Sequence, residues 1–573
     1  MSARQHLKSW PRSIALGPFF CHCLNRPHSS GVSVDTTVSK QAKPPRILLC
    51  GVFGPYGVDD AYGRKENIME LFHNQVTKAQ GIASLRLHHR TFGLYFLAAN
   101  VDADVTVLDF PSRRRFIKEI RKQFDLVGIS LITPNFAKAR EMARLIRENA
   151  PRSEIVLGGH GAAIEGLDRL IDCDHIVCGD GISWLRSHLG QDPEAPVYHP
   201  TLPSNEYRRI LGVPVKGPTA ALLAPGVGCP NACRFCSTSH FFGRQYVPFV
   251  STGRELFDLA CRISDETGTD SFFVMDENLL KQKQRALDML GLMEEHQRWF
   301  RFHIFSSADT ILDFGITNLV RLGVNLVWVG VESRTGSAFD KNVGIDFQEL
   351  VRTLRDHGVG VLTSGILCME HHTPSTMQED IDVLIGLEPD MIQFMLLTGL
   401  PVTRLYRELK DAGTLRQDLA FEEWHGQKML NFHHPAFPGN QPEQWLQSAF
   451  ESDYQRNGSS IGRLIETAVR GARNLAKEAR DDPVIRVRHA QILDQVREYR
   501  PLIRVLKGWA VNDLEKDRVL ELERSVQELI GPRTWRDAGL GIGAAAAARV
   551  WSWRLRIFGD RIQPRTIVTR YTA

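Results

Sequence analysis

From residue 46 onward, short apolar runs alternate with segments whose apolar residues recur at helical spacing. This alternation is typical of a parallel sheet with helices on both faces, the doubly wound (Rossmann-like) α/β arrangement. In the first half of the chain a helix is predicted over residues 137–148, and strands are predicted at 46–52, 105–109, 126–131, 155–157 and 175–177. Ligands of such sheets bind beyond the carboxyl ends of the strands, so a cofactor site is predicted there. The loops concerned are residues 51–56, 130–135, 158–160 and 178–181.

A second series of strands and helices follows a proline-containing linker at residues 191–217. Its strands are predicted at 220–224, 271–275, 302–306, 326–331, 361–367 and 391–397. Six βα units make a partial (β/α)6 barrel of the TIM type, and such barrels carry out their chemistry at the carboxyl ends of the strands. The side chains at these ends are Cys229, Cys233, Cys236, Asp276, Glu277, Asn278, Ser307, Glu332, Ser333, Glu370 and Thr398.

The two ends of the chain lack this alternation. Residues 1–45 contain a single acid, Asp35, and no apolar periodicity, so they predict a disordered leader, with a transit peptide as the alternative. Near the other end, long charged helices are predicted at 461–479 and 513–529. The predicted organisation is a leader (1–45), an α/β domain (46–190), a linker (191–217), a barrel (218–415) and a helical C-terminal region (416–573).

Composition narrows the class of protein without changing this plan. At 573 residues the chain is too long for one hydrophobic core, and 43% apolar and 24% charged residues are ordinary values for a globular protein. The net charge of +4 gives no reason to expect a nucleic-acid partner. Ten cysteines are too few for a disulfide scaffold, and three of them crowd together, which predicts metal ligation in a reducing cytoplasm. The uncharged run at 538–548 falls short of the roughly 18 apolar residues of a membrane-spanning helix.

The three crowded cysteines, Cys229, Cys233 and Cys236, have the spacing CxxxCxxC and follow the first predicted barrel strand directly. A cubic iron–sulfur cluster takes four ligands, so three thiolates leave one iron open to an exogenous group. A structural zinc ion is the alternative reading, but it needs a fourth protein ligand, for which His240 is the nearby candidate. The spacing therefore favours a four-iron four-sulfur cluster.

With Phe235 directly before the last cysteine, this motif resembles the signature of the radical S-adenosylmethionine (SAM) superfamily. The resemblance implies that the amino and carboxylate groups of SAM chelate the open iron. It also implies that reductive cleavage of SAM gives a 5′-deoxyadenosyl radical, with an electron from a donor such as flavodoxin or ferredoxin. In this family Phe235 would lie near the adenine.

The same resemblance assigns further SAM contacts at the strand ends. Asp276 and Glu277 stand where the family holds the SAM amino group, although the family's Gly-Gly-Glu version is absent. Glu332 and Ser333 match the Gly-x-Glu-Ser element near the ribose or carboxylate, with a helix N-cap as the alternative for Ser333. Ile366 matches an adenine contact. The following positions depart from the family pattern: Cys368 replaces a glycine and is expected to be a small buried side chain, and Glu370 is either a site residue or a solvated acid.

An N-terminal doubly wound domain before such a barrel resembles the cobalamin-binding radical SAM group, whose class B members are methyltransferases. In that group Ser130, Gly158 and Gly159 correspond to elements that line the pocket of the cobalamin tail. A glycine lets backbone approach a bulky cofactor closely, and a tight turn is the alternative reason for these glycines. The DxHxxG motif of many cobalamin proteins is absent between residues 46 and 190, so no lower histidine ligand is predicted.

Three functions remain in competition. The first is cobalamin-dependent methylation of an unactivated carbon. The second is radical carbon–carbon coupling, cyclisation or rearrangement without bound cobalamin. The third is a non-catalytic iron–sulfur sensor or scaffold.

The C-terminal region adds hypotheses about the substrate, which is either a small molecule or a lipid. The run 432–435, Phe-His-His-Pro, loosely resembles a region of relatives linked to lipid and isoprenoid products, while a lone His433 or His434 is more often a surface or packing residue. Near the end of the chain, aromatic and basic residues interleave, which fits either peripheral contact with an anionic membrane or a helix packed on the core. These residues are Trp551, Trp553, Phe558, Arg549, Arg554, Arg556 and Arg561.

Overall fold

The computed structural model describes most of the chain from residue 43 onward, and residues 44–573 form one compact unit. The described residues are 43–54, 76–84, 89–204, 209–210, 213–214, 220–334, 339–558 and 565–573. Almost all of the predicted leader, part of the predicted rim loop 51–56 and parts of the linker therefore lie outside the described residues.

The N-terminal domain has the predicted doubly wound parallel sheet. Its parallel strands have the order β2-β1-β3-β4-β5. They are β1 (Arg46–Gly51), β2 (Asp104–Asp109), β3 (Leu126–Ser130), β4 (Glu154–Gly158) and β5 (His175–Ile176). The predicted strands agree with these bounds to within two residues, because strands buried on both faces are nearly continuous apolar runs.

Side chains of successive strand residues enter two separate cores, one on each face of this sheet. Leu48 and Cys50 pack with α3 (Arg113–Ile120) and α4 (Phe136–Asn149). Ile47 and Leu49 pack instead with α2 (Phe92–Ala99) and α6 (Gly181–His188). This alternation is what a parallel sheet covered by helices on both sides requires.

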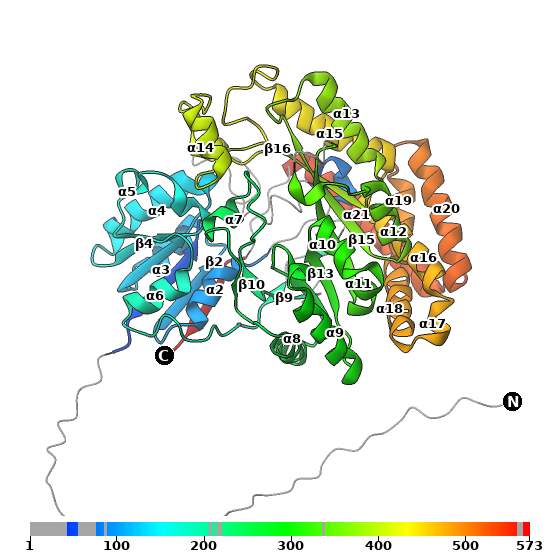
Figure 1. The fold of residues 1–573 in the computed structure, drawn as a ribbon, viewed down its shortest axis with the longest axis horizontal. Coiled ribbons are helices and arrows are strands. Elements are labelled where there is room, and N and C mark those ends of the chain that lie inside the picture. The colour runs from blue at the N-terminus through cyan, green and yellow to red at the C-terminus, as the bar shows by residue number, and fades with distance from the viewer. Residues whose placement is uncertain are drawn as a thin grey trace, which may run out of the picture. The chain divides into compact units, whose positions relative to one another are not determined.

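A sixth strand, absent from the sequence prediction, comes from the far end of the chain. β17 (Ile567–Tyr571) pairs antiparallel with β2, and the red C-terminal strand lies beside the blue N-terminal strands in Figure 1. The Thr566 hydroxyl also donates to the carbonyl of Phe110 at 3.0 Å. The C-terminus therefore closes the edge of the first domain, and the region after residue 416 is not purely helical.

The second sheet is the predicted partial barrel. Six parallel strands have the order β16-β15-β14-β13-β12-β9, and the short β6 (Pro203–Ser204) pairs antiparallel at the edge next to β9. The parallel strands are β9 (Ala220–Leu223), β12 (Ser271–Val274), β13 (Arg301–Phe305), β14 (Val324–Glu332), β15 (Gly360–Leu367) and β16 (Met391–Leu396). Their connecting helices include α8 (Gly253–Thr267), α9 (Lys283–Glu295), α10 (Ala308–Phe314), α11 (Ile316–Leu322), α12 (Phe347–Asp356) and α13 (Pro374–Gly386).

Most of the C-terminal helices share the barrel's core, and a small separate cluster holds Trp551 with Ile82 and Val505. Ile465 and Ala468 of α16 are buried in the same cluster as the barrel residues Leu354 and Val361. The helices of this region are α14 (Arg404–Asp411), α15 (Gln441–Asn457), α16 (Ser460–Leu475), α17 (Glu478–Asp481), α18 (Pro483–Tyr499), α19 (Ile503–Gly508), α20 (Asp513–Ile530) and α21 (Trp535–Phe558).

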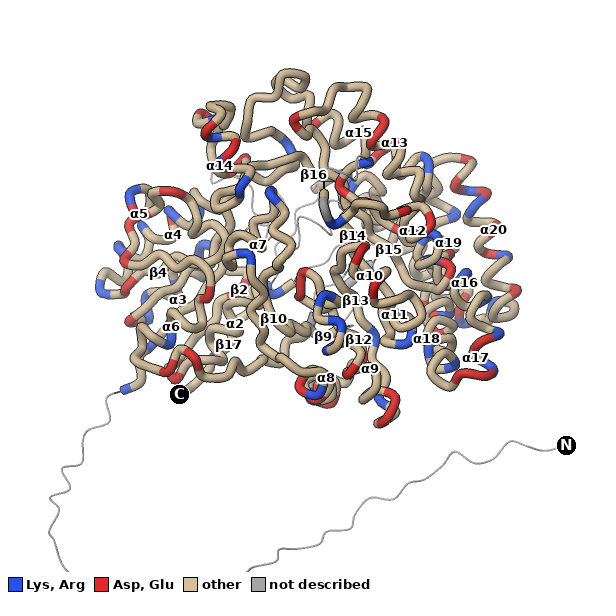
Figure 2. The backbone as a smooth tube through the Cα atoms, in the orientation of Figure 1, with Lys and Arg blue, Asp and Glu red and all other residues tan. Residues whose placement is uncertain are grey.

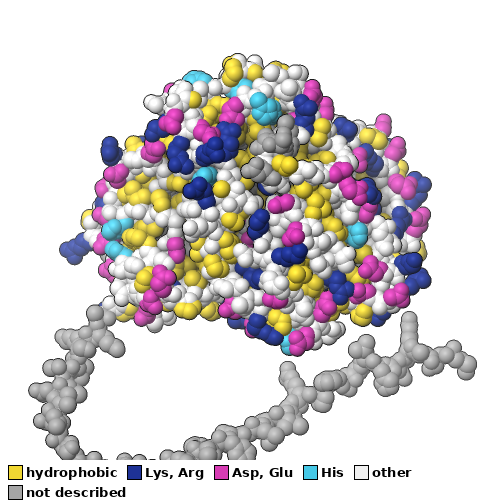
Figure 3. All heavy atoms as spheres, in the orientation of Figure 1, with side chains coloured by type: hydrophobic (Ala, Val, Ile, Leu, Met, Phe, Trp, Pro, Cys, Tyr) yellow, Lys and Arg dark blue, Asp and Glu magenta, His cyan; other side chains and the backbone are white. Residues whose placement is uncertain are grey.

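Charged residues lie mainly on the outer helices, where both signs mix (Figure 2). The space-filling view shows the same mixture of basic and acidic side chains on one face, with hydrophobic side chains between them (Figure 3). No helix among the described residues has the length and apolar character needed to cross a membrane.

Candidate cofactor site

The three cysteines lie on a sharply folded loop between β10 (Gly226–Val227) and the short helix α7 (Ser237–Phe241). Two residues of this loop have left-handed backbone, Gly228 with φ of +83° and Ala232 with φ of +52°. Gly228 has to be glycine, because a Cβ there would stand 2.3 Å from the carbonyl oxygen of Gln245. The loop is tied down by the Ser239 hydroxyl, which donates to the Cys229 carbonyl at 2.6 Å. The backbone therefore fixes where the thiols stand.

The spacing of the three thiols fits the predicted cluster better than one zinc ion. Among the described residues, the sulfurs of Cys229, Cys233 and Cys236 do not meet the 4.8 Å spacing expected of donors to a single ion. Zinc–sulfur bonds of 2.3 Å would bring them to about 3.8 Å from one another, whereas a cube places each sulfur on a different corner. Burial raises the pKa of the Cys236 thiol to about 12 and also raises the pKa of Cys229, so ligation has to displace their protons.

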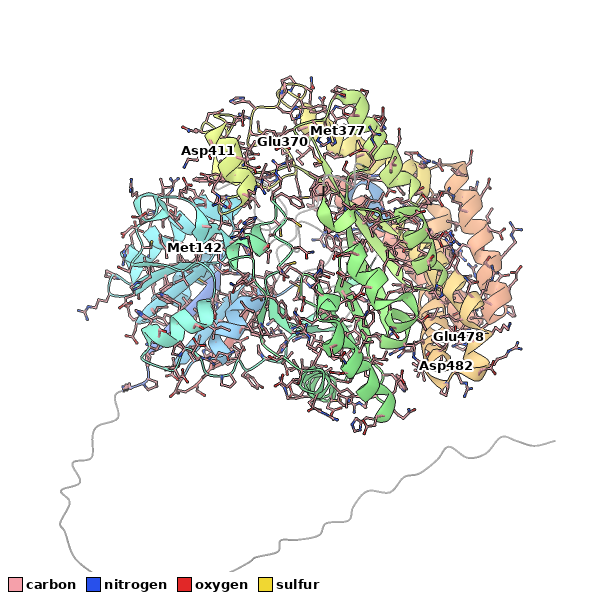
Figure 4. All side chains as sticks on the ribbon, viewed as in Figure 1. Met142, Glu370, Met377, Asp411, Glu478 and Asp482 are labelled. Carbon is pink, nitrogen blue, oxygen red and sulfur yellow. The ribbon has the colours of Figure 1, made fainter. Side chains whose placement is uncertain are left out.

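Arg234, inside the cysteine motif, connects the loop to the barrel rim. Its guanidinium lies 3.0 Å from the Glu408 carboxylate of α14 and also forms an ion pair with Glu370. Its carbonyl accepts from the backbone N–H of Leu405 at 2.9 Å. Figure 4 shows Glu370 on the side of the rim toward α14, whose Asp411 is also labelled. Glu370 is therefore a surface acid that pairs with the cysteine loop.

The end of β12 carries two acids in contrasting environments. Asp276 is buried and accepts from the Tyr246 hydroxyl at 2.8 Å and from Arg285 at 3.1 Å. Burial raises the pKa of Asp276, and the positive charge of Arg285 acts in the opposite direction. Both acids line the cavity described below. The carboxylate of Asp276 is thus already engaged within the protein.

Glu277 differs, because its Oε2 is inaccessible to solvent and has no hydrogen-bond partner in the structure. Burial, with a smaller contribution from the charge of Asp276, raises the pKa of Glu277 to about 7. A buried acceptor without a partner is costly, so the position is suited to a ligand that donates hydrogen bonds. Of the two acids predicted to hold the SAM amino group, Glu277 is the one with an unused oxygen.

The ends of β14 and β15 hold the remaining predicted SAM contacts. Glu332 has a left-handed backbone with φ of +69°, and its Oε1 accepts from Lys341 Nζ at 2.6 Å. A Cβ on Gly330 would stand 2.2 Å from that carboxylate oxygen, so this pair would have to shift to accept a side chain there. The Ser333 hydroxyl donates to Asp380 at 2.5 Å. The helix-cap alternative for Ser333 involves residues 335–338, which lie outside the described residues.

The structure brings most, but not all, of the predicted site residues to one cavity of about 670 Å³. Glu332 and Ser333 are not part of its lining, and Cys229 and Cys233 lie on the same loop as the lining residue Cys236. The predicted residues that line it are Ser130, Gly158, Gly159, Phe235, Cys236, Asp276, Glu277 and Ile366.

At the rim of the N-terminal sheet, Gly158 and Gly159 differ in what a side chain would meet. A Cβ on Gly159, where φ is +85°, would stand 2.7 Å from the carbonyl oxygen of Leu131. A Cβ on Gly158 would meet no protein atom within 4 Å, and Gly158 lines the cavity. The turn alternative therefore applies to Gly159, whereas Gly158 keeps space free for a ligand.

Several residues in or around the cavity were not predicted as site residues. His160 was named only within a rim loop; burial lowers its pKa to about 4, so its imidazole is neutral. Trp424 and His425 reach the cavity from beyond the barrel. Tyr246 and Arg285 act through Asp276, from which they are separated by 30 and 9 residues. Only Arg234 has a local sequence signal, its place inside the cysteine motif.

The histidines of the 432–435 run do not enter the site. His433 is exposed. Both ring nitrogens of the buried His434 are used, one with the carbonyl of Met369 at 2.9 Å and one with the N–H of Ala436 at 3.1 Å. Cys368 is fully buried, as expected of a small core side chain.

A doubly wound domain whose glycine rim shares a cavity with a three-thiol loop on a partial barrel defines a class of proteins. Such a cavity has room for a metal cluster and a bulky second cofactor side by side. Two family models identify this class: the B12 binding domain matches residues 81–186, and the radical SAM superfamily matches residues 223–384. The chain therefore contains a B12-binding domain followed by a radical SAM domain, and the cofactors of these domains are cobalamin, a four-iron four-sulfur cluster and SAM.

Individual relatives are distant. The hopanoid C-2 methylase of Rhodopseudomonas palustris is 26% identical over 33% of this chain, and the match covers 38% of that relative's length. The bacteriochlorophyllide d C-8(2)-methyltransferase of Chlorobaculum tepidum is 24% identical over 52% of this chain and 71% of the relative. A structure of the radical SAM methyltransferase TsrM of Kitasatospora setae, with cobalamin and a [4Fe-4S] cluster bound, is 15% identical over 79% of this chain and 99% of its own, with a TM-score of 0.46.

Proposed function

We propose that this protein is a cobalamin-dependent radical SAM methyltransferase that acts on an unactivated carbon of an apolar, lipid- or isoprenoid-like substrate. The observation that carries the proposal is the shared cavity, because the glycine rim of the B12-binding domain and the cysteine loop of the barrel line the same space. When bound, the cluster and SAM supply a 5′-deoxyadenosyl radical that removes a hydrogen atom from the substrate, and cobalamin supplies the methyl group.

The chain's own residues position these partners. Cys229, Cys233 and Cys236 hold three corners of the cluster, and Glu277 offers its unpaired Oε2 to the SAM amino group. Gly158 leaves room for the cobalamin. Reduction of the cluster takes an electron from a donor such as flavodoxin or ferredoxin, which is part of the proposal.

The apolar substrate is supported by the cavity wall and by one relative. Phe235, Phe241, Phe242, Phe249 and Phe305 all line the cavity. The relative from Rhodopseudomonas palustris is named for a hopanoid, an apolar substrate. Cyclisation is the second candidate, since the anaerobic magnesium-protoporphyrin IX monomethyl ester cyclase of Cereibacter sphaeroides is 22% identical over 53% of this chain.

Anaerobic reconstitution with iron, sulfide and hydroxocobalamin tests the proposal. We expect the protein to retain both cluster and corrinoid after gel filtration. With reductant, SAM that carries a deuterated methyl group and a total lipid extract, it should form 5′-deoxyadenosine, S-adenosylhomocysteine and a lipid with a deuterated methyl group. Retention of the cluster without corrinoid, with 5′-deoxyadenosine as the only nucleoside product, would overturn methylation in favour of cyclisation or coupling.

The proposal includes peripheral contact with an anionic membrane through α21. Trp551 is 8% exposed and packs with Ile82 and Val505, so the core alternative holds for this residue. Trp553 and Phe558 are 62% and 61% exposed. Trp553 belongs to a line of exposed apolar side chains at helical spacing, formed by Trp535, Ile542, Val550, Trp553 and Ile557, and Phe558 lies at its end.

Basic residues accompany this apolar line. Arg536, Arg549, Arg554 and Arg556 are exposed on α21, whose one acid, Asp537, is half-buried. Aromatic side chains interleaved with arginines suit the interface of an anionic bilayer. The predicted Arg561 lies outside the described residues.

Flotation with liposomes tests the membrane contact. The protein should float with vesicles that contain phosphatidylglycerol and much less with pure phosphatidylcholine vesicles, and the double variant Val550→Ser/Trp553→Ser should stay in the dense fraction. Leu312→Ser, at a similarly exposed apolar position on α10, is the matched control and should float like the wild type. Equal flotation of the double variant and the wild type would contradict the contact.

A further inference from the structure

Three side chains that could bind a metal ion converge at the edge of the N-terminal sheet away from the cavity. Glu154 opens β4, His175 opens β5, and His188 ends α6. The Oε2 atom of Glu154 lies 3.2 Å from Nε2 of His175 and 3.0 Å from Nε2 of His188. The three donor atoms all lie within 4.8 Å of one another, and the described residues contain no second such group.

The two imidazoles are held in place by aromatic packing. Trp184, one turn before His188 on α6, stacks on it with ring centroids 5.0 Å apart and an interplanar angle of 11°. Trp184 also contacts the ring of His175 at 5.5 Å, and the two histidine rings are 4.9 Å apart. These contacts restrict the rotamers of both histidines before any ligand arrives, which lowers the entropic cost of binding.

We propose that Glu154, His175 and His188 form a binding site for a divalent transition-metal ion of the zinc class. Two imidazole nitrogens and a carboxylate oxygen are ligands that zinc accepts, with bonds of about 2.0–2.2 Å. In a tetrahedral site such ligands stand about 3.2–3.5 Å from one another, close to the spacing of Glu154 from each histidine. Glu154 and His188 are exposed and His175 is half-buried, so water can complete the coordination.

This ion would be separate from the cluster and structural in effect. Glu154 and Gly158 are the two ends of β4, and Gly158 lines the cavity whereas Glu154, His175 and His188 do not. Five residues of strand span roughly 13–17 Å, so the ion would lie away from the Gly158 end of the cavity, whereas Trp184, which stacks on His188, also lines the cavity. Because its ligands come from β4, β5 and α6, the ion would connect the last strands of the sheet to the helix that covers them.

A shared carboxylate can also hold two histidines by hydrogen bonds alone, without a metal, and the experiment has to separate these cases. Protein with its cluster loaded, so that the cysteines are occupied, is dialysed anaerobically against zinc, and zinc and iron are measured by mass spectrometry. We expect about one zinc ion per chain in the wild type. The exposed histidine variant His433→Ala is the matched control and should bind the same amount.

His188→Gln is the decisive variant, because glutamine retains a donor for Glu154 but is a poor zinc ligand. We expect it to lose most of the zinc while its iron content and circular dichroism match the wild type. Zinc should also raise the Tm of the wild type and leave the Tm of His188→Gln unchanged. Equal zinc content in the wild type and in His188→Gln, or no zinc in the wild type, would overturn the site. Loss of iron in a variant would point to misfolding, and Glu154→Gln then repeats the test.

Discussion

The cavity has two rims, and they hold their ligands by different means. Both are carboxyl edges of parallel sheets, yet the N-terminal rim offers mainly backbone and small or apolar side chains, and its Asp180 is used to cap α6. The barrel rim offers thiols and the acids Asp276 and Glu277. A bulky preformed cofactor needs space and a backbone that it can approach closely. A cluster, in contrast, needs coordinating groups, and a zwitterionic ligand needs charged partners. The comparison indicates that the N-terminal rim selects its ligand by shape, whereas the barrel rim selects its ligands by coordination and charge.

The largest effect is expected when one of the proposed cluster ligands at the barrel rim is removed. Cys233→Ala should abolish cluster assembly and the formation of 5′-deoxyadenosine, since only two thiolates would remain. Iron and sulfide analysis after anaerobic reconstitution measures this. Cys368→Ala, a buried thiol at the end of β15, is the control and should keep its cluster. A full cluster in Cys233→Ala would contradict the assignment of the loop.

Two neighbouring acids should respond in opposite ways. Asp276→Asn leaves Arg285 buried without its charge partner, which should cost about 3–5 kcal/mol of unfolding free energy. Glu277→Gln leaves no buried charge of the protein without its partner and should leave stability near that of the wild type. It should weaken SAM binding about ten- to a hundredfold, the value of a lost charge-assisted hydrogen bond of about 1.5–3 kcal/mol. Denaturant unfolding and SAM titration of the reconstituted protein separate the two.

If instead Asp276→Asn unfolded normally but lost SAM, the acid would serve the ligand directly. The inference that Asp276 serves stability, because Arg285 and Tyr246 engage it, while Glu277 serves SAM would then be wrong.

A smaller effect is expected when a methyl group is added to Gly158 or Gly159 at the rim of the N-terminal sheet. Gly158→Ala should fold normally but bind hydroxocobalamin about five- to a hundredfold more weakly, because overpacking by one methyl group costs about 1–3 kcal/mol. Gly159→Ala should lower stability by at least about 1–2 kcal/mol, since its left-handed backbone disfavours a Cβ. Visible absorbance titration and thermal unfolding report the two effects. Unchanged cobalamin affinity in Gly158→Ala would mean that this rim does not hold the cofactor by shape.

Local sequence patterns predicted the strands of the two sheets well. The strands appeared as continuous apolar runs because both of their faces are buried, and the spacing of the cysteines carries its own chemistry. β17 was missed because five residues at the end of the chain gain their partner only from β2, more than 450 positions earlier. The preferred reading of α21 as a helix packed on the core was only partly right, because apolar residues occupy both its buried and its exposed side.

The chemistry of single side chains was harder to predict. The sequence places Asp276 and Glu277 side by side, and nothing local distinguishes them. The difference arises when Tyr246 and Arg285 reach Asp276 and leave Glu277 Oε2 alone. Similarly, Glu332 matched its motif, but Lys341 already occupies one of its oxygens and neither Glu332 nor Ser333 lines the cavity.

The smallest expected effect concerns Arg234, which links the cysteine loop to the barrel rim. More than a third of the Arg234 side chain is exposed, and the same holds for the side chains of Glu370 and Glu408. Solvent therefore weakens these ion pairs to at most about 1 kcal/mol. Arg234→Ala should therefore assemble a full cluster but lose iron to a chelator a few times faster than the wild type. Arg352→Ala, which breaks an ion pair with Glu349 on α12, is the control and should lose iron at the wild-type rate. If Arg234→Ala failed to assemble a cluster at all, the loop would depend on this charged contact, and the backbone turns at Gly228 and Ala232 would not be enough to place the thiols.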